Sequence, residues 1–105
     1  MTELVTGVVR IFYDVDKTIL QEEYFQLNNK INGIVKKYYE NGKLQREVNF
    51  IDGMMNGIFK SYYDNGQLWE EVLYVNDRPN GILKKYHENG ELKEEVLYIN
   101  GKIVE

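Results

Sequence analysis

The feature that most constrains this chain is a 24-residue segment that occurs three times in succession, over residues 33–56, 57–80 and 81–104. The three blocks align without gaps, and nine of the 24 positions hold the same residue in all of them. Self-similarity at a fixed period indicates a repeat architecture. Residues 7–32 form a degenerate fourth copy, in which Glu23 takes the place of Glu47 and the turn is two residues longer.

Each block is predicted to be one β-hairpin. Two short runs of strand-forming residues flank an Asn-Gly pair, which accepts the positive φ angles of a two-residue type I′ turn. The pairs are Asn41 and Gly42, Asn65 and Gly66, and Asn89 and Gly90. A second, looser turn ends each block, so the four blocks predict about eight strands. The chain also lacks Ala, which helices favour.

We therefore expect an all-β fold. It is a single-layer twisted antiparallel meander of about four tandem 24-residue hairpin repeats, forming one domain over residues 1–105. Its blocks are the degenerate repeat 7–32 and the repeats 33–56, 57–80 and 81–104.

Two registers fit the hairpins. A two-residue turn places Tyr39 opposite Leu44 and Lys36 opposite Glu47. A three-residue loop with a bulge places Tyr38 opposite Leu44 instead and gathers an apolar face, made of Ile34, Tyr38, Leu44, Val48 and Phe50. The two-residue turn is favoured because it also pairs the opposite charges of the later blocks, Lys60 with Glu71 and Lys84 with Glu95.

Composition excludes several classes of function. The net charge is −4 and no segment is a basic stripe, which argues against a nucleic-acid partner. The absence of a polybasic cluster makes binding to an anionic membrane a poor expectation. With no Cys and one His, neither a thiolate nor a multi-His metal site is available, and we expect no metal or cofactor. The N-terminus does not read as a signal peptide, so a cytoplasmic location is expected.

The recurring pattern G-x-x-K-x-Y-Y-x-N-G-x-L-x-x-E-x-x-Y resembles the MORN-repeat variant family, over residues 33–104 closely and 7–32 weakly. That family includes bacterial proteins described as YwqK-type antitoxins of toxin–antitoxin systems. The resemblance implies a non-catalytic, bacterial, protein-binding module whose partner is a cognate toxin. Departures from the pattern are His87 for the second Tyr, Asp77 for the loop Gly, and the whole turn of the first block.

The three repeated glutamates are the only candidates for catalysis. Glu47, Glu71 and Glu95 would stand roughly 10 Å apart if two strands separate each pair. That spacing is near the separation of the two carboxylates in inverting glycosidases. A structural ladder facing the repeated lysines explains the same residues, and it is the interpretation we prefer. No Ser or Cys stands near a base, so no catalytic residues are assigned and the chain is not expected to be an enzyme.

Four aromatic side chains are candidates for a partner-binding surface: Trp69, Tyr39, Tyr63 and His87. Trp69 replaces Gln45 and Lys93, which are polar residues at the same repeat position. Trp is enriched among interface anchors. The alternative is that its ring packs on Tyr62 across the hairpin. His87 occupies a Tyr position and is interpreted as an aromatic stand-in.

Three functions are compatible with the sequence. The first is a non-catalytic interaction module, with a cognate toxin as the partner that the resemblance implies. The second is a self-assembling or membrane-peripheral scaffold that associates through the open sheet edges, residues 4–12 and 96–104. The third, an enzyme, has only the glutamate ladder in its favour.

Overall fold

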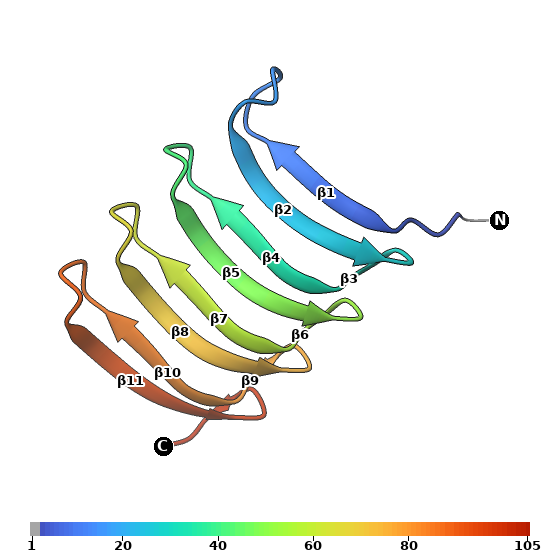
Figure 1. Cartoon of the computed structure of the whole chain (residues 1–105). Coiled ribbons are helices and arrows are strands. Elements are labelled where there is room, and N and C mark those ends of the chain that lie inside the picture. Colours follow the sequence, from blue (N-terminus) through green and yellow to red (C-terminus); the bar gives the residue numbers. More distant parts are fainter. Residues whose placement is uncertain (1–2) are drawn as a thin grey trace.

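The computed structural model describes residues 3–105 as a single antiparallel sheet (Figure 1). Eight long strands follow one another across the sheet in chain order. They are β1 (Gly7–Phe12), β2 (Leu20–Leu27), β4 (Gly33–Tyr38), β5 (Leu44–Ile51), β7 (Gly57–Tyr62), β8 (Leu68–Val75), β10 (Gly81–Tyr86) and β11 (Leu92–Ile99). The expected all-β meander of hairpin repeats is confirmed, and the described residues contain no helix.

Four two-residue strands complete the sheet and fold back on the long strand before them. They are β3 (Lys30–Ile31), β6 (Met54–Met55), β9 (Arg78–Pro79) and β12 (Lys102–Ile103). The turns that lead into them have positive φ at both central residues, for example +49° at Asp52 and +82° at Gly53. This is the signature of a type I′ turn. The turn that the sequence indicated to be looser is therefore the two-residue one.

The Asn-Gly turns are three-residue loops, and our prediction of a type I′ turn there is wrong. The Tyr39 N–H donates to the Lys43 carbonyl at 2.8 Å, which closes the loop around Glu40, Asn41 and Gly42. Gly42 has a φ of +87°, whereas Asn41 stays out of the positive region. The Asn41 side-chain oxygen instead accepts the Lys43 N–H at 2.9 Å. The same bonds recur in the loops of Asn65 and Asn89.

The strand register combines both predicted alternatives. Lys36 lies opposite Glu47, as the two-residue turn predicted, but Tyr38 lies opposite Leu44, as the three-residue loop predicted. A bulge between Lys37 and Tyr38 absorbs the difference of one residue. Every long hairpin has the same bulge, including the first. A bulge leaves one residue of the longer strand without a cross-strand partner.

Successive residues of a strand point to opposite faces of the sheet. The face we call the valine face carries Val35, Val48 and Val72, which are the buried hydrophobic residues of the described chain. The opposite face, which we call the ladder face, carries the lysine and glutamate pairs. Because Val35 lies opposite Val48, the alternative face that gathered Ile34 with Val48 does not form.

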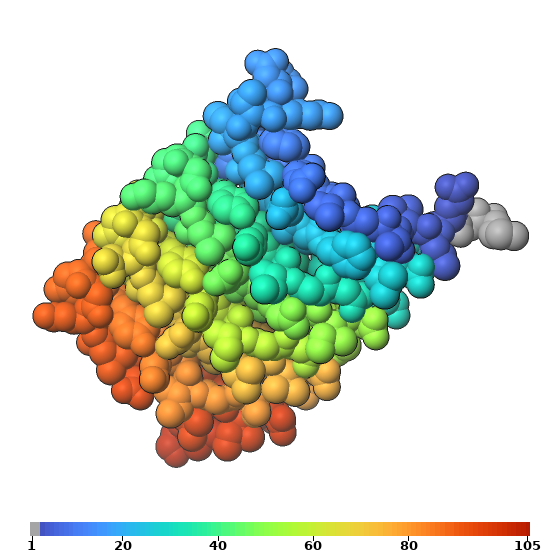
Figure 2. Space-filling view, in the orientation of Figure 1, coloured from blue at the N-terminus to red at the C-terminus, as the bar shows by residue number. Residues whose placement is uncertain are grey.

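The sheet is a thin layer with principal extents of 48 × 33 × 14 Å. In the space-filling view the colours run from the first hairpin at one edge to the last hairpin at the other (Figure 2). No large side chain among the described residues is fully buried. A single layer with so small a core leaves both faces in contact with solvent or with a partner.

Candidate interaction surface

Trp69 occupies the bulge of the third long hairpin. Ser61 pairs with Glu70 and Tyr62 pairs with Leu68, so Trp69 has no partner across the strands. Its indole stacks instead on the ring of Tyr63, with centroids 5.4 Å apart and planes 24° apart. We call this pair the aromatic stack. The expected alternative partner, Tyr62, is therefore replaced by its neighbour, because the bulge shifts the register by one residue.

In the aromatic stack, Tyr63 is anchored by a hydrogen bond and Trp69 is exposed. The Tyr63 hydroxyl donates to the Tyr86 carbonyl at 2.7 Å, which fixes the ring to the next hairpin. Trp69 remains 44% exposed although it rests on this anchored ring. An exposed indole held in one orientation loses little conformational entropy when a partner covers it.

In the first three hairpins, the tyrosine that follows the first long strand joins its hairpin to the next one. The hydroxyls of Tyr13, Tyr39 and Tyr63 donate to the carbonyls of the following hairpins at 2.6–2.7 Å. Burial, followed by the charge of Asp64, raises the pKa of the Tyr39 hydroxyl. Tyr39 and Tyr63 are thus held by inter-repeat bonds, and a partner-binding role for them stays a prediction. His87 takes the tyrosine position in the hairpin of β10 and β11.

The ladder face carries charges of alternating sign across the whole sheet. Each residue lies opposite the next in the order Arg10, Glu23, Lys36, Glu47, Lys60, Glu71, Lys84 and Glu95. The predicted pairs within each repeat are part of this longer row. The connection between repeats and the extension to Arg10 were missed, although the alignment of Glu23 with Glu47 already contained that signal.

Two glutamates of the row, Glu47 and Glu71, accept hydrogen bonds from the hairpin that follows their own. Tyr62 donates to Glu47 at 3.1 Å and Tyr86 donates to Glu71 at 3.3 Å. Burial, together with the bond to Glu47, raises the pKa of Tyr62 to about 12. Arg10 and Glu23 form a direct ion pair of 2.7 Å. These contacts tie Glu23, Glu47 and Glu71 to neighbouring strands, and the structural role of the full ladder stays a prediction.

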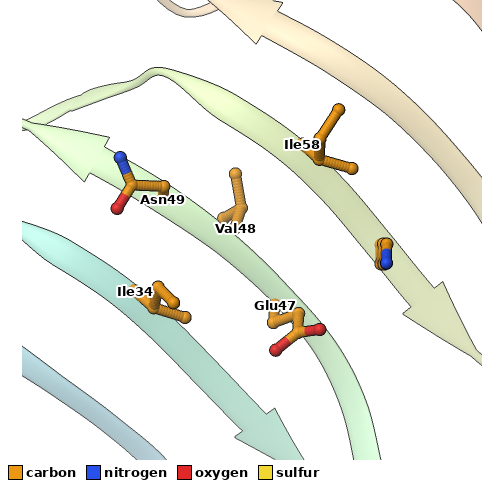
Figure 3. Close-up of a pocket in the computed structure, with 6 residues that line it drawn as sticks. Ile34, Glu47, Val48, Asn49 and Ile58 are labelled. Atoms are coloured by element: carbon orange, nitrogen blue, oxygen red, sulfur yellow. The ribbon is translucent and has the colours of Figure 1, made fainter.

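An exposed apolar stripe runs beside the charged row. Ile34, Ile58 and Ile82 occupy the same position of successive repeats and are about half exposed. Ile34 and Ile58 stand on either side of Glu47 and Asn49 in β5, and together they line an open hollow of about 260 Å³ (Figure 3). Repeated exposed aliphatic residues of this kind are typical of a surface that contacts a partner.

The valine face has two smaller hollows on either side of Phe59. One is lined by residues that include Val35, Phe50 and Met55, and the other by residues that include Tyr74 and Leu83. Phe59 meets Tyr74 edge to face, with ring centroids 5.9 Å apart. These hollows are small, with volumes of about 160 and 120 Å³, so they suit a partner side chain more than a whole substrate molecule.

Asparagines between the repeats form a row that sequence reasoning missed. The side-chain oxygens of Asn32, Asn56 and Asn80 accept the backbone N–H groups of the next type I′ turns, those of Asp52, Asn76 and Asn100, at 2.9–3.1 Å. The 24-residue spacing of the three asparagines was the available signal. Block boundaries placed Asn32 outside the compared repeats, and Val104 interrupts the series at its end.

Over residues 3–105, no group of three or more His, Cys, Asp or Glu side chains is arranged to hold a metal ion. Within the same residues, no helix has the length and apolar character needed to span a membrane.

Comparison with protein families gave one match. The sequence model of the MORN repeat variant matches residues 31–52, 55–76 and 79–104, which together make up 70 of the 105 residues. Each matched segment begins at the second residue of a short strand, two residues before the long first strand of a repeat. Comparisons with curated proteins and with solved structures gave no significant match.

Proposed function

The chain belongs to the MORN repeat variant family, and on that premise we propose that it is a non-catalytic module that binds a protein partner through the aromatic stack. Repeats of this family are generally interaction modules. An extended repeat sheet also offers a broad surface on which a partner can rest.

The observation that carries the proposal is the exposure of Trp69. The equivalent positions of the sibling repeats hold Gln45 and Lys93, so the fold does not require an aromatic ring there. A ring that the fold does not need, and that remains 44% exposed on an anchored tyrosine, is best explained by a contact outside the chain.

The partner that we propose is a toxin protein encoded beside this chain, with both proteins in the bacterial cytoplasm. Support for this comes from the resemblance of the repeats to antitoxin-type members of the family. The isoleucine stripe gives the module a second apolar surface, which lies on the ladder face and therefore on the opposite side of the sheet from the aromatic stack.

The test is a titration of the purified product of the neighbouring gene by calorimetry. Trp69→Ala is expected to raise the dissociation constant about tenfold or more, as loss of an aromatic anchor does. Gln45→Ala and Lys93→Ala are the matched controls, because they change the same bulge position in the sibling hairpins. Unchanged affinity of a folded Trp69→Ala variant would remove the aromatic stack from the proposal.

The second candidate function is a self-assembling scaffold. It is favoured by the sheet edges, because β1 and β11 each have one long strand neighbour only. Unpaired strand edges pair readily with other chains. A mass that rises with protein concentration in the absence of any partner would support this function.

A further inference from the structure

The first edge of the sheet is built like an internal junction between repeats. β1 presents the same kinds of residues that β10 uses against the hairpin before it. The corresponding residues in β1 and β10 are Val8 and Ile82, Val9 and Leu83, and Arg10 and Lys84. A terminal repeat of a solenoid normally has a polar outer face that ends the array, and β1 lacks one.

The last edge is built as the other half of the same junction. β11 presents the residues that β8 uses against the hairpin after it. The corresponding residues in β11 and β8 are Glu95 and Glu71, Val96 and Val72, and Leu97 and Leu73. Each half of an internal junction is therefore exposed, one at either edge of the molecule (Figure 1).

From these edges we propose that copies of the chain associate head to tail, with β1 of one copy against β11 of another. β8 and β10 pair in the interior with Glu71 opposite Lys84 and Glu70 opposite Lys85. Repeating that register between two copies places Arg10 of the second copy opposite Glu95 of the first. The eight long strands alternate in direction, so β1 meets β11 antiparallel when both copies have the same orientation.

The charged row selects this arrangement over the alternatives. The row begins with a cation, Arg10, and ends with an anion, Glu95. Head-to-tail contact continues the alternation, whereas contact between two first edges or two last edges brings like charges together. Like charges directly opposite on neighbouring strands are destabilising.

For two copies to meet in this register, the C-terminal strand of the first copy must displace the N-terminal segment around Val5 of the second copy. Within one copy Val5 exchanges two hydrogen bonds with Asn29, accepting its N–H at 2.9 Å and donating to its side chain at 2.8 Å. Pro79 accepts the N–H of Gly101 in the same way, at 2.8 Å. Ile103 lies 24 residues after Pro79, at the same position of the next repeat. Its carbonyl is therefore placed to accept the N–H of Asn29 in the second copy. Val5 of the second copy, which is about half exposed, then gives up its hydrogen bonds to Asn29.

The inference rests on the scaffold function proposed above and gives it a partner and a register. A head-to-tail contact is heterologous, so successive copies form either a closed ring or a filament. The Trp69 proposal is independent of it, because the aromatic stack lies inside the array and not at an edge.

Charge reversal tests the register on the full chain. Sedimentation at low salt is expected to show that Glu95→Lys weakens association about tenfold, because attraction to Arg10 becomes repulsion. Glu94→Lys is the matched control, since the residue opposite it would be the uncharged Ile11. Equal effects of the two variants would overturn the register, and a wild-type chain that stays monomeric at all concentrations would overturn both the inference and the scaffold function.

A disulfide trap gives a second readout. The chain has no cysteine, so no native thiol competes when Arg10→Cys and Glu95→Cys chains are mixed and oxidised, and each variant oxidised alone measures the background of homodimers. Directly opposite residues have Cβ atoms close enough for a disulfide. A covalent heterodimer is expected from this mixture. Arg10→Cys mixed with Glu94→Cys should give much less, because Glu94 points to the other face. Equal yields from the two mixtures would contradict the proposed register.

Discussion

The Tyr62 hydroxyl donates to Glu47 Oε1 at 3.1 Å and thereby joins two repeats through their side chains. The bond crosses from β7 to β5, and the Tyr86 hydroxyl repeats it to Glu71 in the next pair of hairpins. In a sheet with so few buried residues, such contacts between repeats replace a central core. Tyr suits such contacts because its ring packs on the sheet while its hydroxyl still donates a hydrogen bond.

Replacing Tyr62 by Phe should lower the free energy of unfolding by about 1 kcal/mol, the usual net value of such a hydrogen bond. Urea denaturation followed by circular dichroism measures the change. Tyr38→Phe is the matched control, because the glutamate equivalent to Glu47 in its case is Glu23, which pairs with Arg10. A loss in Tyr38→Phe as large as in Tyr62→Phe would show that the ring environment matters and the bond does not.

Alkaline pH should destabilise the protein partly through Tyr62. Its pKa is raised from 10.0 to about 12 in the folded chain, first by burial and then by Glu47. Below pH 10 both states keep the proton, so the stabilising contribution is intact. Between pH 10 and about 12 the unfolded chain loses the proton first, and the free energy of unfolding falls as pH rises. Tyr62→Phe should show a shallower decline, and an identical slope would refute the assignment.

The sequence predicted the strands and the charge pairs because both are repeated properties. Lys36 opposite Glu47 could be predicted since three blocks carried the same opposite charges at the same distance from the turn. The order of strands followed from short connections, which leave consecutive strands as neighbours. The repeat was therefore sufficient to predict the order of the long strands and the charge pairs within each hairpin.

The sequence did not predict which turn would be tight. Glycine after asparagine suits a type I′ turn and equally a three-residue loop that ends in a positive φ. The bond from the Lys43 N–H to the Asn41 side chain goes with the second choice. Asn76 and Asp77 both adopt positive φ although neither is glycine. Residue preferences assign positive φ mainly to glycine, so they did not predict this turn. The bulge that leaves Trp69 without a cross-strand partner accompanies the three-residue loop. Because the loop was predicted wrongly, the stacking of Trp69 on Tyr63 was not predicted either.

Glycine should be needed more strictly at Gly57, between the strands β6 and β7, than at Gly42 in the loop. Both Gly42 and Gly57 have positive φ, which strains any other residue. A Cβ at Gly42 meets nothing within 4 Å, whereas a Cβ at Gly57 would lie 3.0 Å from the Cβ of Asn49. Gly57→Ala should therefore cost about 1 kcal/mol more than Gly42→Ala. Thermal unfolding of the two variants measures the difference, and the reverse order would count against the packing argument.

The buried valines should contribute unequally along the array. Val48 and Val72 are 7% and 6% exposed, whereas Val96, the equivalent residue of the last hairpin, is not buried. Truncation to Ala should cost about 2 kcal/mol at Val48 or Val72 and clearly less at Val96. Denaturant titration of the three variants gives the comparison. Equal costs would mean that Val96 is covered in solution, as the head-to-tail contact would cover it at high concentration, so the measurement belongs at low concentration.

The asparagine row should protect the type I′ turns from opening. The Asn56 side-chain oxygen accepts the Asn76 N–H at 2.9 Å. Asn56→Ala leaves that N–H without its acceptor, which should cost about 1–2 kcal/mol and speed hydrogen exchange at Asn76. Asn56→Asp keeps an acceptor oxygen at the same place and should preserve most of the protection. Exchange measured by NMR at Asn76 decides between them, because equal acceleration in both variants would show that the contact does not hold the turn.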